Sequence, residues 1–376
     1  MSVCGLFYVL RGGIFVLKNK RQTNIDLIES IAIFFVLVYH STLYFFDFLS
    51  DNSFMNYVSY FSRTILSTCV PLFFFANGYL LFNRPFDLKK HIYKMLKIIA
   101  LIFIWALLLM HIYILISGEQ YSIRTVIFSI LNQDTAWAMN IFWYLCALIS
   151  IYVLFPALKA LFDSNKKAFI FFTVACAILT FGFVFVNQIS AFLGVLLHHR
   201  ISIVDKLMIQ MFNPFRGAFG YSFVYFCVGG LICTYEDKIR LISKRKRNIV
   251  SCIGILVSCL LLFLVGVFYS KFINNDVWDV VWNGYDSIFT FFNVIFIYVL
   301  SLNYTKDYRF IRSISCNTLG IYFTHEIVVR STISWMKSFD FLCNIPVNLI
   351  YAFAIMCVCL GLCLVIRKIP LLKKLL

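Results

Sequence analysis

The sequence predicts an all-α integral membrane protein, a bundle of about ten transmembrane helices with the N- and C-termini cytoplasmic. Its 376 residues are 62% hydrophobic and only 13% charged, whereas soluble domains carry about 25% charged residues. The apolar runs are also continuous, and the strands of a membrane barrel would instead alternate polar and apolar residues. These observations exclude a soluble enzyme, a secreted disulfide scaffold and a disordered chain.

Ten segments are apolar over a length that spans a bilayer, which needs about 20 such residues. They are Ile25–Phe46, Tyr57–Phe82, Ile98–Ile116, Ile141–Leu161, Ala168–Val186, Ala218–Tyr235, Ile249–Tyr269, Ile288–Leu302, Ile311–Met336 and Ile345–Ile366. The eighth segment is short, and we expect its helix to begin near Asp286. Ile189–Leu197 is too short to span, and we expect it to be interfacial or re-entrant.

The basic residues test this count. With the N-terminus inside, 25 of the 33 Lys and Arg residues fall on the cytoplasmic side, as the positive-inside rule requires. The net charge of +16 is thus a topology signal and predicts no nucleic-acid partner. For the Lys244-Arg245-Lys246-Arg247 cluster, contact with an anionic ligand or lipid headgroup is the second interpretation.

No internal repeat or large soluble insertion divides the sequence, so residues 1–376 are predicted to form a single transmembrane domain. We interpret residues 1–23 as an N-terminal interfacial segment, or as the product of an early start codon. The 13 cysteines lie mostly inside apolar runs and do not show metal-site spacing. No metal site is predicted.

Ionisable residues inside the spans are the informative ones, because they are costly in lipid and by default face a cavity or a partner. His40 lies fifteen residues after Ile25, about 22 Å along the first helix. His325 lies fourteen residues after Ile311, about 21 Å along the ninth. Both spans run outward, so the two imidazoles should reach one level, in the outer half.

Helical spacing places further groups around these histidines. Glu29 and His40 are eleven residues apart, three turns plus about 20°, so they share a face of the first helix. Glu326 and Arg330 have the i,i+4 spacing and order that favour an ion pair. We interpret His111, on the third span, as a structural hydrogen-bonding residue.

A histidine in such a cavity suits acyl transfer to a hydroxyl. Imidazole takes and returns a proton near neutral pH, and a sugar hydroxyl needs such a base to attack an ester or thioester. A cavity inside a helix bundle also excludes competing water. The sequence contains no G-x-S-x-G, P-loop, H-E-x-x-H or G-x-G-x-x-G motif that would supply another mechanism.

Five segments in chain order, spread over roughly residues 20–366, resemble the membrane-bound acyltransferase-3 family. They are Asn24–Ala32 continuing to Val38-Tyr39-His40-Ser41, Val70–Leu81, Phe142–Leu145 with Tyr152 and Pro156, Tyr225-Phe226 with Gly229-Gly230, and Gly320–His325. The resemblance implies an O-acyltransferase, usually an O-acetyltransferase. Members move an acyl group from cytosolic acyl-coenzyme A to a surface carbohydrate such as an O-antigen, a capsule or another exported polysaccharide.

The resemblance also implies roles for single residues. His40 matches the family's catalytic histidine. Independently of the resemblance, we expect His325 to orient the acceptor or stabilise charge. Lys94 and Lys97 match a basic pair that would bind coenzyme A phosphates, although ordinary positive-inside charge explains them equally well. Glu29 stands where the family commonly has Arg, so either another cation binds the donor or Glu29 pairs with a Lys or Arg on a neighbouring helix.

The remaining candidate residues are expected to line the pocket or contact the acceptor. They are Glu29, Asn77, Tyr79, Trp143, Tyr322 and Glu326. Asn77 stands where the family often has Ser. Aromatic faces suit sugar rings, but plain helix packing explains the three aromatic residues as well.

The resulting hypothesis is a multi-pass enzyme of the bacterial cytoplasmic membrane. It would transfer an acetyl group from acetyl-CoA, a co-substrate and not a permanent cofactor, to a surface polysaccharide or its lipid-linked precursor. His40 would act as general base, directly or through a transient acyl-His40. The alternatives are a polysaccharide flippase or transporter and a glycan polymerase, neither with acyl-transfer activity.

Overall fold

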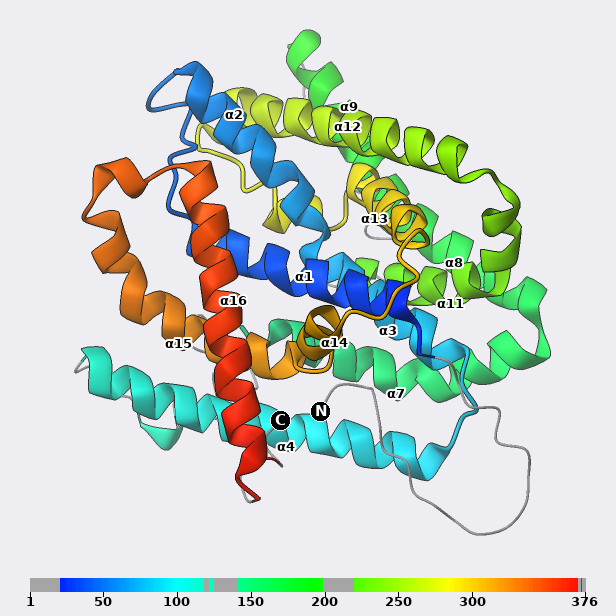
Figure 1. Cartoon of the computed structure of the whole chain (residues 1–376). Helices are drawn as coiled ribbons and strands as arrows, with labels where there is room; N and C mark the ends of the chain where they lie inside the picture. The colour runs from blue at the N-terminus through cyan, green and yellow to red at the C-terminus, as the bar shows by residue number, and fades with distance from the viewer. Residues whose placement is uncertain (1–20, 118–121, 125–140, 199–219, 371–372, 374–376) are drawn as a thin grey trace. The chain divides into compact units, whose positions relative to one another are not determined.

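The structure is a computed structural model that describes residues 21–117, 122–124, 141–198, 220–370 and 373. The described residues form helices joined by loops and contain no strand (Figure 1). The predicted all-α integral membrane class is confirmed. Of the predicted interfacial segment, residues 1–20 lie outside the described part of the chain.

The helices are bounded as follows. They are α1 (Thr23–Ser41), α2 (Phe54–Arg63), α3 (Cys69–Phe82), α4 (Leu88–Ser117), α7 (Trp143–Ser164), α8 (Lys166–Ala177), α9 (Phe183–Leu196), α11 (Gly220–Leu241), α12 (Lys244–Tyr269), α13 (Ile288–Ser301), α14 (Arg309–Ser315), α15 (Thr318–Lys337) and α16 (Ile345–Lys368).

Within the described residues, seven helical stretches are long and apolar enough to cross a membrane. They are Thr23–Ser41, Phe54–Phe82, Leu88–Ile112, Trp143–Ser164, Lys166–Leu196, Lys244–Asn274 and Ile345–Lys368. The predicted eighth span is the shorter apolar helix α13. The predicted sixth span is α11. The predicted ninth span, Ile311–Met336, is divided, because α14 ends at Ser315 and α15 begins at Thr318. Helices α11 and α15 carry more polar residues than the seven stretches.

Two further local expectations are wrong. The segment 189–197 is not a separate interfacial piece, because α8, a π-helical turn at Ile178–Gly182 and α9 make one helical stretch that ends at Leu196. The first helix ends at Ser41 and not at Phe46. His40 therefore lies in the last turn of α1.

The chain groups into two compact units, and each is described by itself. The first consists of Met1–Phe73, Ile239–Cys259 and Phe292–Leu376, and the second of Phe74–Lys238 and Leu260–Phe291. The expectation of a single domain stays a prediction.

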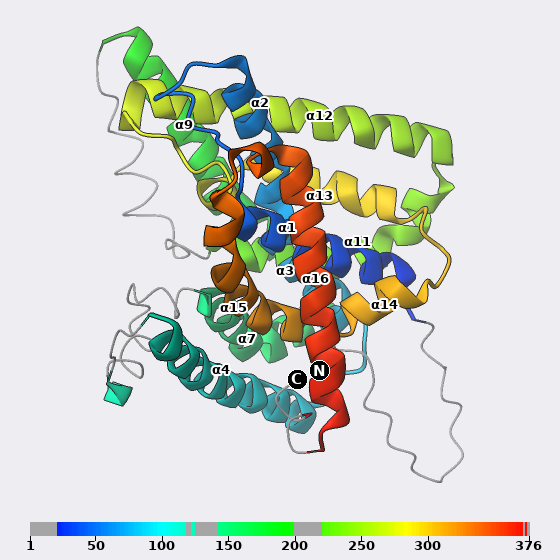
Figure 2. The same cartoon turned by 60° about the vertical axis from the view of Figure 1, so that its left-hand side comes forward.

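Helix α1 is the centre of the first unit. It packs against α14, α15 and α16 and against the 3₁₀ turn Thr64–Thr68, and α15 packs in turn against α16 (Figure 2). Buried aliphatic residues such as Ile28, Ala32, Ile33 and Leu37 line α1 along its length, each fully shielded from solvent. This packing fixes the helix that carries both Glu29 and His40.

In the second unit, α3 and α11 approach each other closely through two glycines. A Cβ on Gly78 would lie 1.8 Å from the carbonyl oxygen of Phe226, and one on Gly229 would lie 2.1 Å from that of Phe75. Such contacts are possible only without a side chain, as in other small-residue helix interfaces in membranes. The motif residues Gly78 and Gly229 therefore have a packing role.

Gly78→Val is expected to destabilise the protein strongly. The obstacle to the new side chain is backbone, which cannot rotate away, and overpacking of this kind costs about 1–3 kcal/mol or more. Gly361→Val is the matched control, because a Cβ on Gly361 has no atom within 4 Å. Thermal unfolding in detergent should show a lower Tm for Gly78→Val alone, and equal values would contradict the assigned role.

Candidate functional site

His40 lies at the carboxyl end of α1, with 36% of its side chain exposed. The ring of His325, on α15, lies 5.1 Å from its own, centroid to centroid. The expectation that two histidines from separate helices reach one level is thus met by their geometry. The carboxyl end of a helix carries a partial negative charge, which favours a positively charged side chain there.

His325 is fully buried, and its tautomer follows from its partner. Its Nδ1 lies 2.6 Å from the carbonyl oxygen of Tyr322, and because a carbonyl only accepts, Nδ1 must carry the hydrogen. In the neutral ring, Nε2 is then the acceptor. This atom is buried and has no hydrogen-bond partner among the described residues.

Glu326 brings a carboxylate between the two imidazoles. Its Oε2 lies 4.0 Å from His40 Nδ1 and 4.0 Å from His325 Nε2. Its other oxygen, Oε1, accepts a 2.5 Å hydrogen bond from Arg330 Nε, so the predicted i,i+4 ion pair forms. A negative charge here stabilises an imidazolium on either histidine.

These three side chains also satisfy the chemical requirement for a metal site, since their ligand atoms lie within 4.8 Å of one another. Ligands about 2.0–2.1 Å from a zinc ion would lie roughly 3.3 Å apart, which is closer than the 4.0 Å separations seen here. Arg330 also occupies one carboxylate oxygen. At these separations Glu326 acts on the two imidazoles through its charge rather than through a direct hydrogen bond.

Two buried residues that the sequence analysis did not single out hold the end of α1. Asn348, on α16, donates to the carbonyl of Val38 at 3.2 Å and accepts from the amide of Leu43 at 3.0 Å. Arg63 donates to the hydroxyl of Thr42 at 3.2 Å. Asn348 thus satisfies a carbonyl that the helix end leaves open, and the three contacts together fix the turn that contains His40.

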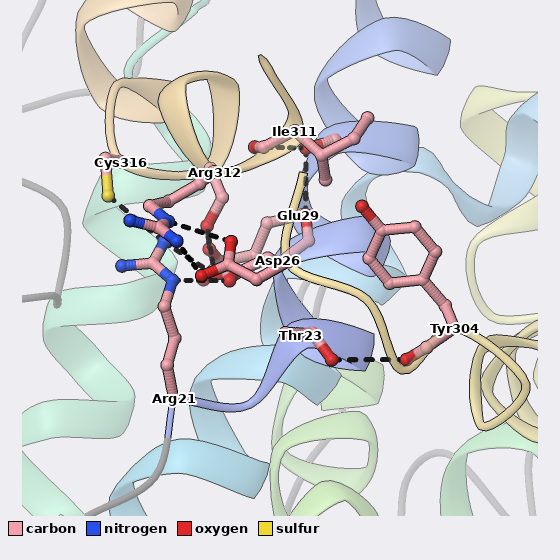
Figure 3. A network of polar contacts seen from close by, with 11 residues as sticks. Arg21, Thr23, Asp26, Glu29, Tyr304, Ile311, Arg312 and Cys316 are labelled. Atoms are coloured by element: carbon pink, nitrogen blue, oxygen red, sulfur yellow. Dashed lines mark hydrogen bonds and ion pairs between the residues drawn. The ribbon is translucent and has the colours of Figure 1, made fainter. Parts of the chain in front are cut away.

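Glu29 is not part of this cluster, because it lies three turns earlier on α1. The hydroxyl of Ser315 lies 2.6 Å from Glu29 Oε2 and 2.8 Å from Asp26 Oδ1. Arg21 binds Asp26 through two nitrogens, at 2.5 and 2.9 Å (Figure 3). A cation is present in this network, but Arg21 directly precedes α1 and its partner is Asp26, so the pairing of Glu29 with a Lys or Arg on a neighbouring helix stays a prediction.

In the second unit, Tyr152 connects two of the predicted site residues, Lys94 and Asn77. Lys94 Nζ donates to the hydroxyl of Tyr152 at 2.9 Å, and that hydroxyl donates to Asn77 Oδ1 at 3.1 Å. Lys94 also lies 4.8 Å from the centre of the Tyr152 ring. The tyrosine fixes the position of the ammonium group relative to α3.

The helix that carries Lys94 is fixed at its start as well. Asp87 accepts from the amide of Lys90 at 3.1 Å, and this hydrogen bond holds the pKa of the Asp87 carboxyl below its ordinary value. His91 donates from Nε2 to the carbonyl of Tyr152 at 2.7 Å. That carbonyl is available because Pro156, four residues later, has no amide hydrogen to offer it.

The other predicted residues of the second unit have separate surroundings. The hydroxyl of Tyr79 donates to Glu236 Oε2 at 2.5 Å. Trp143 packs against Trp282 and Tyr285, with ring centroids 5.0 and 5.9 Å away. Lys97 is half-buried on α4, one turn after Lys94. The ring of Tyr79 is buried and that of Trp143 is half-buried, so both contribute to helix packing.

A comparison with known protein families matches residues 22–368 to the acyltransferase-3 family, described as an acyltransferase domain. The chain belongs to the acyltransferase-3 family. The match covers all the motifs from which the resemblance was drawn, and membership together with the apolar helices supports a multi-pass membrane acyltransferase. No curated protein and no solved structure matches the chain.

Proposed function

We propose that this acyltransferase is an O-acetyltransferase of the bacterial cytoplasmic membrane, which transfers an acetyl group from acetyl-CoA to a hydroxyl of a surface polysaccharide or its lipid-linked precursor. The observation that supports the proposal best is the cluster of His40, His325 and Glu326. It combines a partly exposed imidazole with a buried imidazole and a carboxylate within 4.0 Å of both.

His40 acts as the general base. Its Nδ1 is on the side of Glu326, and we assign proton transfer to Nε2, on the opposite side of the ring. Nε2 takes the proton of the acceptor hydroxyl as the oxygen attacks the thioester carbonyl. The C–S bond then breaks, and the thiolate of coenzyme A leaves with the proton returned by His40.

Glu326 and His325 support this step. The carboxylate balances the positive charge that His40 gains in the transition state, in the same way as the acidic member of a catalytic triad. The Nε2 lone pair of His325, fixed by the contact of Nδ1 with Tyr322, is buried and is proposed to accept a hydrogen bond from the acceptor sugar once the sugar enters the cluster. Its role is to orient the hydroxyl toward His40.

Lys94 and Lys97 are proposed to bind the phosphates of coenzyme A. Lys94→Ala is expected to raise the KM for acetyl-CoA about tenfold, the effect of losing one charge-assisted hydrogen bond, with little change in kcat. Lys89→Ala is the matched control, because Lys89 is exposed on the same helix. Equal KM values in the two variants would remove Lys94 from donor binding.

Acetyl analysis of the surface glycan tests the proposed reaction. A deletion strain should make the glycan at normal length and amount but without its acetyl groups, and purified protein should transfer labelled acetate from acetyl-CoA in the presence of a chelator. A strain that makes no surface glycan would indicate a flippase or transporter, and one that makes only single repeat units would indicate a polymerase.

A further inference from the structure

Arg247 differs from the three basic residues that precede it. Lys244, Arg245 and Lys246 are exposed in the first turn of α12, whereas Arg247 is only 9% exposed. It lies on the same face of the helix as the buried Ser251 and as Gly254, where a Cβ would lie 2.3 Å from the Phe296 ring. Arg247 therefore belongs to the face that packs toward α13.

The guanidinium of Arg247 has no counter-ion in the described part of the chain. Its Nε and Nη1 are buried and without a hydrogen-bond partner there. The acidic residues of α1 are engaged elsewhere, Asp26 by Arg21 and Ser315, and Glu29 by Ser315. A buried charge without a partner is strongly unfavourable, so this arginine is expected to bind an anion from outside the chain.

The connection after α13 lies against this end of α12. Asn303 donates to Asn248 Oδ1 at 2.6 Å, and Arg240 donates to the carbonyl of Leu302 at 3.1 Å. The Oδ1 of Asn303 and the hydroxyl of Tyr304 are buried and also lack partners among the described residues. Asn303, with its unsatisfied Oδ1, is thus bonded to the residue that follows Arg247, whereas Tyr304 lies beside α1, where Thr23 binds its carbonyl in Figure 3.

The start of α12 adds hydrogen-bond donors. The hydroxyl of Ser243 accepts a hydrogen bond from the amide of Lys246 at 3.4 Å. The amides of Lys244 and Arg245, in the same first turn, point out of the helix end. Side chains on a helix lean toward its N-terminus, so Arg247 is directed to the same place. Helix N-termini and guanidinium groups both favour phosphate.

We infer that Arg247 and the amino end of α12 bind a phosphate ester on the predicted cytoplasmic side. Two sources share this chemistry, the phosphates of coenzyme A and the headgroup of an anionic phospholipid. With the lipid as source, the site goes beyond the proposed acetyl transfer. With coenzyme A as source, the inference rests on the proposed function and adds Arg247 to the residues that bind the donor.

The test compares Arg247→Gln with Arg245→Gln, the exposed neighbour, both in the His40→Ala protein so that catalysis plays no part. Coenzyme A and phosphate-free pantetheine are titrated against each variant, and retained phosphatidylglycerol is counted by native mass spectrometry. An affinity for coenzyme A at least tenfold weaker in Arg247→Gln alone, with pantetheine unaffected, supports the coenzyme as source. Loss of phosphatidylglycerol in Arg247→Gln alone supports the lipid.

Variants that match in both measurements would overturn the inference. Should Arg247→Gln fail to fold, the unsubstituted protein provides the answer. Pyrophosphate or phosphatidylglycerol must then raise the Tm of the unsubstituted protein, compared with its Tm in sodium chloride of equal ionic strength. If neither compound raises the Tm, the inference is overturned as well. Because all readouts are binding or stability, a failure here leaves the acetyl-transfer proposal standing, and the reverse also holds.

Discussion

His40→Ala is expected to lower acetyl transfer by about 10²–10⁴-fold, the contribution of a positioned general base. The side chain is 36% exposed, so its truncation leaves no closed cavity, and the protein should insert and fold normally. The rate is measured with labelled acetyl-CoA and purified protein in detergent, and folding by the Tm of the same preparation.

His111→Ala is the matched control for this substitution, because His111 is an exposed histidine on α4. It should retain full activity. Transfer that persists in His40→Ala at the rate of the control would remove His40 from the mechanism, both as base and as carrier of a transient acetyl group.

Glu326→Gln is expected to lower kcat by about 10²-fold with little effect on the KM for acetyl-CoA. The substitution keeps the shape of the side chain but removes the charge that lies 4.0 Å from both imidazoles. Unit charges at this distance interact by roughly 4 kcal/mol near a protein surface, and much of that interaction arises only when His40 is protonated in the transition state.

A second substitution separates this effect from the loss of the ion pair with Arg330. That arginine has 43% of its side chain exposed, so Arg330→Gln alone should have a small effect. The double variant should be as slow as Glu326→Gln. Recovery of activity in the double variant would mean that the single substitution acts by leaving Arg330 unpaired, and the carboxylate would then have no role in catalysis.

The geometry of the histidine pair could be predicted from sequence, because a helix converts residue number directly into depth. Counting from Ile25 and Ile311 placed His40 and His325 at one level, and their rings lie 5.1 Å apart, although the second count crosses the break between α14 and α15 at 316–317. The position of Glu326 between them was not predicted, since its i,i+4 relation to Arg330 explained it fully.

Other parts of the site depend on contacts between distant segments, which no local pattern encodes. Asn348 holds the end of α1 from 310 residues away, and Tyr152 joins Lys94 to Asn77 across three helices. The burial of Arg247 had a local signal that was not used. Ser251 and Gly254 follow Arg247 by four and seven residues and so share its face of the helix. Their small size marks a packed face on a helix whose other side chains are mostly large and apolar.

Pro156 has a consequence for the register of α4. Because the proline leaves the carbonyl of Tyr152 open, His91 is bonded to it directly, and the side chain of the same tyrosine is bonded to Lys94. Two residues one turn apart on α4 are therefore attached to a single residue of α7. Sliding or rotating α4 by one residue would break both hydrogen bonds at once. The apolar side chains of α4 would allow many positions of the helix along α7, but these two bonds restrict it to one.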